Sequence, residues 1–384
     1  MSPASPAQSG STPISTHDPV NAQILSVSED RITGFNRAPM DEIARLSGVA
    51  LDTVLERIRA LLAAGTIRRI RQTLVANDLA PGALVAWNVP AEKIDAAFDT
   101  LFREDPFSGH VVVRSTDQET AGSQYKLWTT LKVPQGFSMA KHATFLLNKI
   151  GGHHFKLMPA KGIFALGVGH VRRREIPFGS KGEALAEMHE IKVQSLNELE
   201  WRVLTALKRE FTLAEIVPGE ALWAARAQEA DVPLAVFHEV AEELNRRGVI
   251  GRFSTFLEHV KANAAGERVT RFNALFHWAV PEGRQLAAGR EIGRFHIMTH
   301  AYWREGGPEF NHVNLMGVAH GTDKEIVKGH KAAIDAHLQA EGFPISYTNI
   351  FWGGRSEIKP SEIAPQAYKE WAATAGVDWR EMQA

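Results

Sequence analysis

The stretch Ile297-Met-Thr-His300-Ala-Tyr302-Trp-Arg304 alternates in the manner of a β-strand. The next stretch, Phe310-Asn-His312-Val-Asn314-Leu-Met-Gly-Val-Ala-His320-Gly321, is typical of its hairpin partner. Successive side chains of a strand point to opposite faces, so His300, Tyr302 and Arg304 are expected on one face. Imidazole, phenol and guanidinium groups are costly to bury without partners. A row of them on a sheet therefore indicates a binding site for an anionic ligand.

The same order of elements occurs twice along the chain. Phe272-Asn-Ala-Leu-Phe-His-Trp-Ala-Val-Pro matches Ala83-Leu-Val-Ala-Trp-Asn-Val-Pro, and His300 and Arg304 match His110 and Arg114. In each half, two helical patterns and a strand precede strands and helices in the order β-α-β-β-α-β. The sequence therefore predicts an α+β protein, built as a tandem duplication of a winged helix-turn-helix plus a ferredoxin-like domain.

Turn signals and shifts in composition divide the chain into six segments. We predict a disordered N-terminal arm at 1–22, a winged helix-turn-helix at 23–78, a ferredoxin-like domain at 79–170, a linker at 171–192, a second winged helix-turn-helix at 193–262, and a second ferredoxin-like domain with a C-terminal tail at 263–384. Residues 211–231 form an insert without a counterpart in the first half, and its role stays open. One more edge strand is expected at 162–168.

Composition excludes several kinds of site. The chain is 44% hydrophobic and 23% charged with a formal net charge of -1, which is ordinary for a globular protein. Because it has no cysteine, it lacks disulfides, Cys-ligated zinc, Cys-ligated iron–sulfur clusters and thiolate-ligated haem. We therefore expect no iron–sulfur cluster and no structural zinc. No apolar run approaches the roughly 18 residues of a membrane span, and no signal peptide is recognisable. The expectation is a cytoplasmic protein without a membrane partner.

The element order resembles that of the leucine-responsive (feast/famine) regulators. Four local sequences are more similar to a branch of that superfamily, the siroheme decarboxylases, which work as pairs of related subunits or as fused pairs. They are Leu62-Ala-Ala-Gly-Thr-Ile-Arg-Arg-Ile, Ala86-Trp-Asn-Val-Pro, Thr299-His-Ala-Tyr-Trp-Arg and Asn314-Leu-Met-Gly-Val-Ala-His-Gly. The resemblance implies a carbon–carbon lyase that binds an iron tetrapyrrole and removes acetate carboxyls of siroheme, in haem d1 synthesis or the siroheme-dependent haem route.

By this resemblance, His300, Tyr302 and Arg304 are the expected catalytic residues. His300 lies against the tetrapyrrole and is a candidate axial ligand of the iron, while Tyr302 and Arg304 address its carboxylates. The first half keeps His110, a second candidate iron ligand, but has Val112 where the family has Tyr, so the halves are expected to differ. The further candidates for tetrapyrrole binding are imidazoles and cations: His110, Arg114, His154, His312, His320, Lys126 and Arg271.

The residue types suit this chemistry. Loss of CO₂ from an acetate leaves charge that a conjugated macrocycle can absorb, so the protein mainly positions the ligand. Arginine holds carboxylates bidentately, and an imidazole, with an unperturbed pKa of about 6.5, can exchange the proton. One histidine cannot ligate iron and donate a proton at the same moment, so a second histidine is needed if His300 ligates.

Three other interpretations remain open from the sequence. One is a haem-binding protein or haem-dependent enzyme of different activity on the same fold. Another is a DNA-binding regulator with a small-molecule effector, favoured by Arg68, Arg69 and Arg71 on the first wing and Arg59 before it, and disfavoured by the near-neutral charge. The third is an assembly module without a ligand. A homodimer through the ferredoxin-like sheets is expected, and Arg68→Ala is predicted to leave siroheme turnover unchanged.

Overall fold

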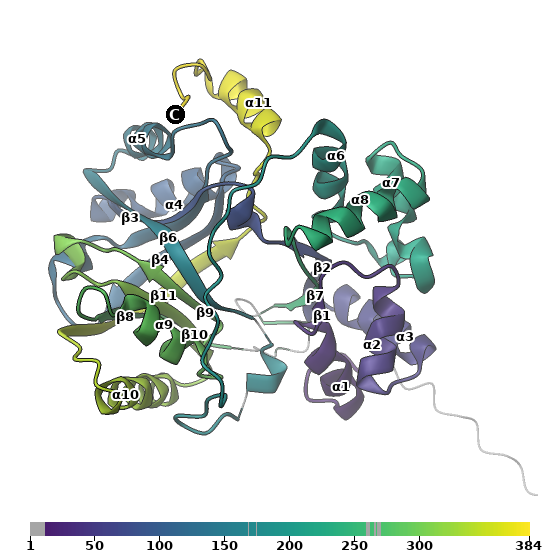
Figure 1. Ribbon diagram of the computed structural model, residues 1–384, viewed down its shortest axis with the longest axis horizontal. Coiled ribbons are helices and arrows are strands. Elements are labelled where there is room, and N and C mark those ends of the chain that lie inside the picture. Colours follow the sequence, from purple (N-terminus) through teal and green to yellow (C-terminus); the bar gives the residue numbers. More distant parts are fainter. Residues whose placement is uncertain (1–11, 168, 174, 259–261, 265, 267–269) are drawn as a thin grey trace, which may run out of the picture.

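Eight strands form one closed barrel, drawn at the left of Figure 1. The computed structural model describes residues 12–167, 169–173, 175–258, 262–264, 266 and 270–384. The first half supplies strands β3 (Gly82–Asn88), β4 (Ser108–Thr116), β5 (Leu127–Lys132) and β6 (His154–Leu166). The second half supplies strands β8 (Phe272–Ala279), β9 (His300–Arg304), β10 (Leu315–Gly321) and β11 (Tyr347–Ile358).

The two halves use the same element order, as the sequence predicts. Helices α4 (Ile94–Arg103) and α5 (Met139–Ile150) give β3-α4-β4-β5-α5-β6, and helices α9 (Gln285–Gly293) and α10 (Lys324–Ala340) give β8-α9-β9-β10-α10-β11. Around the barrel the strands run β6-β3-β5-β4 in one half and β11-β8-β10-β9 in the other, all antiparallel. The halves join where β11 pairs with β4 and β6 pairs with β9. The two sheets thus pair edge to edge within one chain, and the homodimer expected through them stays a prediction.

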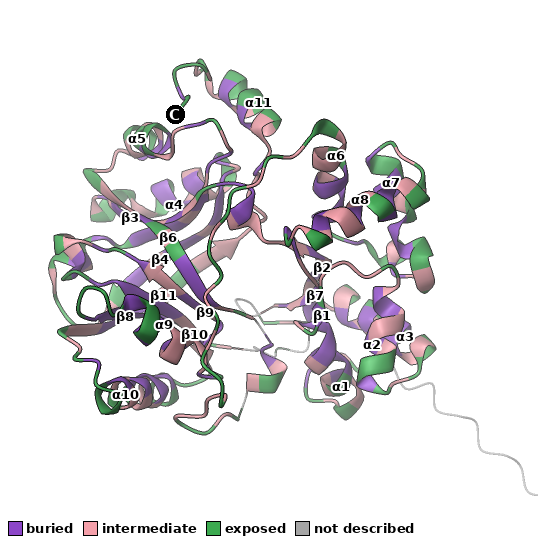
Figure 2. Cartoon of the chain, viewed as in Figure 1, coloured by how far each residue is buried: buried purple, intermediate pink, exposed green. Residues whose placement is uncertain are grey.

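Strand alternation separates the barrel interior from the layer beneath the helices. On β4, Val112 faces an interior cluster with Trp128 and Met316, whereas Val111 packs in the cluster beneath α4 and α5. Figure 2 shows the same division, with buried residues on the strands and inner helix faces and exposed residues on the outer helix faces. Successive residues of a strand therefore serve two different cores, as the period of two requires.

The helical part of the molecule, at the right of Figure 1, contains the segments predicted as two winged units. The first has α1 (Pro19–Ser28), β1 (Ile32–Thr33), α2 (Pro39–Ser47), α3 (Leu51–Ala63) and β2 (Ile67–Leu74). The second has α6 (Glu198–Leu207), α7 (Ala224–Glu229), α8 (Leu234–Arg246) and β7 (Ile250–Leu257). Both share one hydrophobic core. Their strands form a single antiparallel sheet in the order β1-β7-β2, which lies between these helices and the barrel.

Short 3-10 helices and a C-terminal helix complete the described elements. The 3-10 helices are η1 (Ala76–Asp78), η2 (Ala91–Lys93), η3 (Ala121–Gln124), η4 (Val171–Arg173), η5 (Leu213–Glu215), η6 (Gly219–Trp223) and η7 (Pro308–Phe310). Helix α11 (Pro365–Ala375) packs on the first half, where the Tyr368 hydroxyl lies 3.0 Å from Nδ1 of buried His142. The tail of the second half therefore packs against the first half.

Two sequence predictions need correction. Asp18 caps a helix that begins at Pro19, because its side chain accepts hydrogen bonds from the backbone N–H groups of Val20 and Asn21, so the predicted arm cannot extend to residue 22. Residues 1–11 of that arm lie outside the described residues. The edge strand expected at 162–168 is the second part of the single long strand β6. In the insert at 211–231, whose role the sequence leaves open, η5, η6 and α7 fold around buried Trp223.

No helix in the described ranges combines the length and apolar character needed to cross a bilayer.

Candidate functional site

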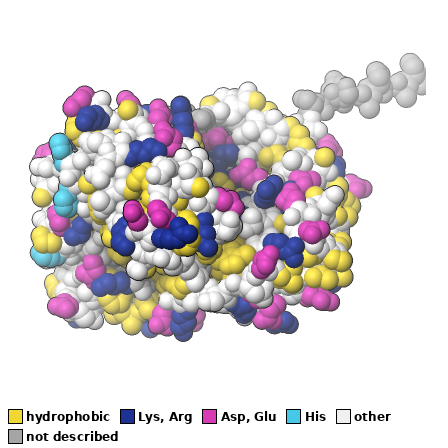
Figure 3. Space-filling view, turned by 90° about the horizontal axis from the view of Figure 1, so that it is seen from above, with side chains coloured by type: hydrophobic (Ala, Val, Ile, Leu, Met, Phe, Trp, Pro, Cys, Tyr) yellow, Lys and Arg dark blue, Asp and Glu magenta, His cyan; other side chains and the backbone are white. Residues whose placement is uncertain are grey.

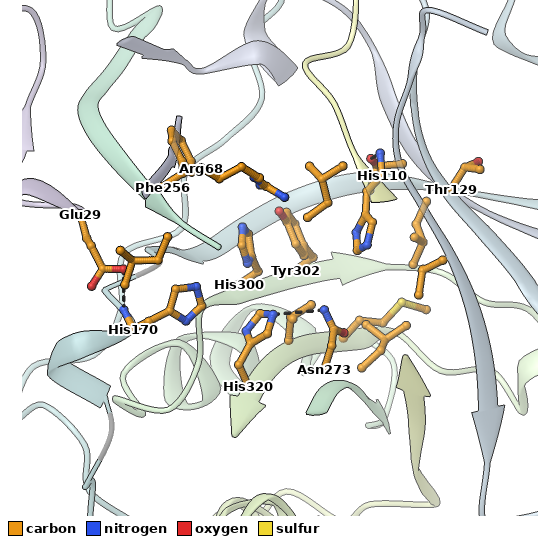
Figure 4. Close-up of a pocket in the computed structure, with 18 of the residues that line it drawn as sticks. Glu29, Arg68, His110, Thr129, His170, Phe256, Asn273, His300, Tyr302 and His320 are labelled. Carbon is orange, nitrogen blue, oxygen red and sulfur yellow. Dashed lines mark hydrogen bonds between the residues drawn. The ribbon is translucent and has the colours of Figure 1, made fainter. Parts of the chain in front are cut away.

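A cavity of about 320 Å³ lies between the barrel and the β1-β7-β2 sheet. This volume is within the range of small-molecule sites. The barrel contributes inward-facing residues of seven strands, the sheet contributes residues of β2 and β7, and Glu29 and His170 come from the segments after α1 and β6. Figure 4 shows this arrangement with ten of the lining residues labelled.

The row that the sequence predicts on β9 does line the cavity. His300, Tyr302 and Arg304 share one face of the strand. The rings of His300 and Tyr302 are nearly parallel, with centroids 6.1 Å apart, and the Arg304 guanidinium lies over the Tyr302 ring at 4.5 Å. Arg304 is anchored because its Nη1 donates to the backbone oxygen of buried Met158. Packing and hydrogen bonding therefore fix the orientation of the row.

Burial sets the protonation of this row. Desolvation, with the nearby charges of Arg252 and Arg173, lowers the pKa of His300 to about 4, so its imidazole is neutral near pH 7. Desolvation also raises the pKa of Tyr302, which keeps its phenol protonated. The row thus offers a neutral imidazole, a phenol that can donate a proton, and a cation.

Hydrogen bonds beside β9 define which nitrogen of His300 is free to react. The Thr299 hydroxyl donates to the backbone oxygen of Val318 at 2.9 Å. Having used its hydrogen there, this hydroxyl accepts from Nδ1 of His300 at 3.2 Å and from Nδ1 of His320 at 3.4 Å. Asn273 donates to Nε2 of His320 at 3.1 Å, which agrees with that tautomer. His300 therefore carries its proton on Nδ1 and keeps the lone pair of Nε2 for a ligand.

The matching residues of the first half face the same cavity. His110 and Arg114 on β4 line it together with Val112, which takes the place of Tyr302. Nε2 of His110 lies 2.8 Å from the Ser356 hydroxyl, and Arg114 donates to Asn273 at 3.3 Å. Burial lowers the pKa of Arg114 to about 9. The duplication therefore builds one cavity with two unlike walls, and not one pocket in each half.

The cavity is strongly cationic although the chain is nearly neutral. Among the described residues, Glu29 is the one carboxylic acid of the lining, and burial raises its pKa to about 8 even though it accepts backbone hydrogen bonds from His170 and Val171. Four histidines also line it: His110, His170, His300 and His320. Six arginines complete the set: Arg68, Arg69, Arg71, Arg114, Arg252 and Arg304. Such a lining favours a ligand with several negative charges.

The arginines of the first wing are not arranged as the DNA-binding interpretation expects. Arg68, Arg69 and Arg71 line the cavity because β2 pairs with β7 and turns this face toward the barrel. Arg59, the fourth basic residue of that interpretation, donates to the backbone oxygen of Ile216. On the face drawn in Figure 3, cationic and acidic side chains are interspersed. Arg68, whose replacement by Ala is predicted from the sequence to leave siroheme turnover unchanged, therefore lies on the cavity, and the turnover itself stays a prediction.

Four predicted binding residues do not line the cavity. His154 and Lys126 are exposed, and His154 lies at the start of β6 with Nδ1 3.3 Å from the Tyr125 hydroxyl. His312 is exposed in the turn after η7, with a left-handed φ of 55°. Arg271 is exposed one residue before β8. Of the predicted set, the structure brings together His110, Arg114, His300, Tyr302, Arg304 and His320.

Sequence reasoning missed Glu29, His170, Arg252 and Asn273, which also line the cavity. Asn273 occupies an inward position of β8, two residues before Leu275, so strand alternation could have identified it. The pairing of Glu29 with His170 joins residues 141 positions apart, and no local pattern predicts it.

Comparison with known proteins identifies the class of domain. A family model, the AsnC-like ligand binding domain, matches residues 80–164 and 270–351. The same model therefore matches twice, once in each half of the chain, as the duplication predicts.

Two solved structures share the fold over nearly the whole chain. The crystal structure of the siroheme decarboxylase NirDL has a TM-score of 0.62 and 19% sequence identity, covering 92% of this chain and 98% of that chain. The crystal structure of NirDL in co-complex with an iron-uroporphyrin III analogue also has a TM-score of 0.62 and 19% identity, covering 93% of this chain and 99% of that chain. A search of curated proteins finds no match to this chain.

Proposed function

We propose that this protein is a tetrapyrrole-binding decarboxylase that removes acetate carboxyls from siroheme. The main support for the proposal is the β9 row of His300, Tyr302 and Arg304, which lies on a cavity whose described lining has six arginines and a single acid. Siroheme carries many carboxylates around an iron-bearing ring, and this charge distribution complements it. The fold shared with a siroheme decarboxylase supports the same assignment.

The proposed reaction consumes one proton for each CO₂ released. The bond between the acetate methylene and its carboxyl carbon breaks, CO₂ leaves, and the electron pair left on the methylene takes up a proton to give a methyl group. The conjugated ring of the substrate delocalises that pair. Arg304 and Arg114 hold carboxylates that do not react, as bidentate partners. The Tyr302 phenol is the proposed proton donor.

His300 is proposed to position the ring. Its imidazole is neutral, and Nε2 has a lone pair because Nδ1 donates to Thr299. A neutral imidazole nitrogen can ligate iron, so His300 is the first candidate for the axial position and His110 is the second. In this proposal the tetrapyrrole is the substrate, and the iron enters and leaves with it.

We also infer the finer domain assignment. The strand order β6-β3-β5-β4, with helices on one face, supports a ferredoxin-like domain at 79–170, and β11-β8-β10-β9 supports another at 263–384. Helices α2 and α3 followed by β2, and helices α6 and α8 followed by β7, support winged helix-turn-helix units at 23–78 and 193–262. In this proposal the wings have become part of a ligand site.

The test is anaerobic incubation of the purified protein with siroheme, followed by mass spectrometry of the tetrapyrrole and by CO₂ measurement. The expected product is lighter by one or two CO₂. His300→Ala should slow the reaction at least about 100-fold. The matched control is His153→Ala, which removes an exposed imidazole remote from the cavity lining. Unchanged siroheme, together with a stoichiometric haem spectrum of the isolated protein, would instead favour a haem protein of another activity.

A further inference from the structure

The β2–β7 side of the cavity carries a second group of cations, separate from the barrel wall. We call Arg68, Arg69, Arg71 and Arg252 the roof arginines. They come from the paired strands of the two helical units. Figure 4 draws Arg68 on the side of the cavity opposite His320, whose strand belongs to the barrel. A ligand in the cavity would therefore meet cations from two opposite sides.

An irregularity in the strand pairing brings three of these arginines to one cavity. In a regular strand, Arg69 and Arg71 share a face and Arg68 points to the other. The pairing shifts between Ile67, opposite Leu257, and Arg69, opposite Phe256, so Arg68 is the extra residue of a bulge. A bulge redirects a side chain, and all three arginines line the cavity.

The roof arginines are poorly compensated by the protein itself. Arg69 pairs with Glu210 at 3.4 Å, and Nε of Arg252 donates to the backbone oxygen of Glu29 at 3.4 Å. The guanidinium groups of Arg68 and Arg71 have no hydrogen-bond acceptor and no ion pair among the residues that the structure describes. The Nε atoms of Arg68, Arg69 and Arg71 are buried without an acceptor in that part of the chain.

Phe256 holds this cluster in place. The guanidinium carbons of Arg69 and Arg71 lie 5.1 Å and 5.4 Å from the centroid of its ring. Desolvation, together with neighbouring arginine charges, lowers the pKa of both Arg69 and Arg71 to about 10. Like charges gathered beside one ring, with donors left unpaired, cost free energy unless an anion binds between them.

We propose that the roof arginines bind carboxylate arms of the tetrapyrrole that the barrel wall does not reach, so that the cavity selects its ligand by its number of carboxylates. This inference rests on the proposed function for the identity of the ligand, but it assigns specificity to β2 and β7 and not to the β9 row. A tetrapyrrole with carboxylates all around its edge can bind both the roof arginines and the cations of the barrel wall. A tetrapyrrole with carboxylates on a single edge can bind only one of these two groups of cations.

The experiment compares two probes by absorbance titration of the full chain. Iron uroporphyrin III carries a carboxylate pair on every pyrrole, whereas iron protoporphyrin IX carries carboxylates on one edge only. Arg68→Gln combined with Arg71→Gln should raise the Kd for iron uroporphyrin about 100-fold, because each substitution removes a charge-assisted hydrogen bond that is worth roughly tenfold in affinity. The Kd for iron protoporphyrin should change less than about threefold.

A charge-matched control isolates the position of the arginines. Arg45→Gln combined with Arg246→Gln removes two arginines of the same helical units whose side chains are 66% and 72% exposed. This control should bind both probes as the wild type does. Arg68→Lys combined with Arg71→Lys keeps the charge without the guanidinium fork and should give an intermediate loss, which also covers the case in which the double Gln variant does not fold.

Two results would overturn the proposal: unchanged affinity of the roof variants for iron uroporphyrin, or equal losses of affinity for both probes. Siroheme kinetics separate it from the proposed function. Roof variants of an active decarboxylase should raise KM more than they lower kcat. If the roof variants decarboxylate siroheme as the wild type does, only the proposal for the roof arginines is refuted. Roof-dependent uroporphyrin binding by a wild-type protein that never decarboxylates siroheme refutes the proposed function alone.

Discussion

His277 is expected to make the stability of this protein depend steeply on pH below about 6.5. Its side chain is fully buried on β8 inside the barrel, among the rings of Trp128, Phe310 and Phe351. Neither ring nitrogen has a hydrogen-bond partner among the described residues. Desolvation first, and then the charges of Arg114 and another buried cation, lower the pKa of His277 to about 3.

The sign and size of the effect follow from proton linkage. An unfolded histidine has a pKa of about 6.5, so at about pH 4.5 the unfolded chain has bound a proton at this position and the folded chain has not. The stability contributed by neutral His277 is therefore complete above about pH 6.5 and is lost as the pH falls toward 3. Two pH units below 6.5 correspond to a loss of about 2.7 kcal/mol from this one residue.

The variant His277→Met removes the titration and keeps a similar volume with a flexible, polarisable side chain. Urea unfolding followed by tryptophan fluorescence, at about pH 7 and about pH 4.5, should show the wild type losing about 2 to 3 kcal/mol more than the variant. The exposed His153→Gln variant should follow the wild type. Parallel losses in wild type and His277→Met would refute the assignment of a buried neutral imidazole.

Three further predictions concern the site and the C-terminal helix. Tyr302→Phe should slow siroheme decarboxylation about 10- to 100-fold in single-turnover assays, yet leave the Kd for iron uroporphyrin within about threefold, because the ring still stacks beside His300 and only the proton donor is lost. The rate should stay level as the pH falls through 6.5 and drop only toward 4, because burial lowers the pKa of His300 to about 4 and its neutral form persists; an acid limb centred near 6.5 would contradict this. Tyr368→Phe should cost about 1 to 2 kcal/mol in thermal unfolding, because the hydroxyl beside buried His142 disappears, and an unchanged Tm would show that this hydrogen bond does not hold the tail.

Strand periodicity predicted more of the site than any other signal. The alternation of His300, Tyr302 and Arg304 fixed their common face, and the repeat transferred that expectation to His110 and Arg114. Local patterns define a face, but they do not define which end of a strand reaches a cavity. The closure of the barrel decides which end does so. His154, a predicted site residue at the start of β6, therefore lies outside the cavity lining.

The residues on the β2–β7 side of the cavity could not be predicted from local sequence patterns, for a different physical reason. Arg68 would be the outward residue of a regular wing, and only the pairing of β2 with β7, two strands about 180 residues apart in the chain, creates the bulge that turns it inward. Glu29 reaches the site through backbone N–H groups of a distant segment. Patterns within one strand carry no information about such pairings, so the sequence could not show that the arginines of the first wing line the cavity.

Fusion of the two halves gives the cavity a property that identical subunits could not have. A symmetric pair would place the same row on both walls, whereas this chain has Tyr302 on one wall and Val112 on the other. The β9 wall offers a phenol beside a neutral imidazole, and the β4 wall offers an apolar side chain between His110 and Arg114. An asymmetric ligand gains free energy in one of the two orientations that the pseudo-symmetry of the barrel allows, because burying a polar arm against Val112 leaves that arm without a partner. If the proposed ligand binds here, this difference of one residue between the two copies of the repeat is expected to favour one orientation of the ring, which an unfused pair of identical chains could not do.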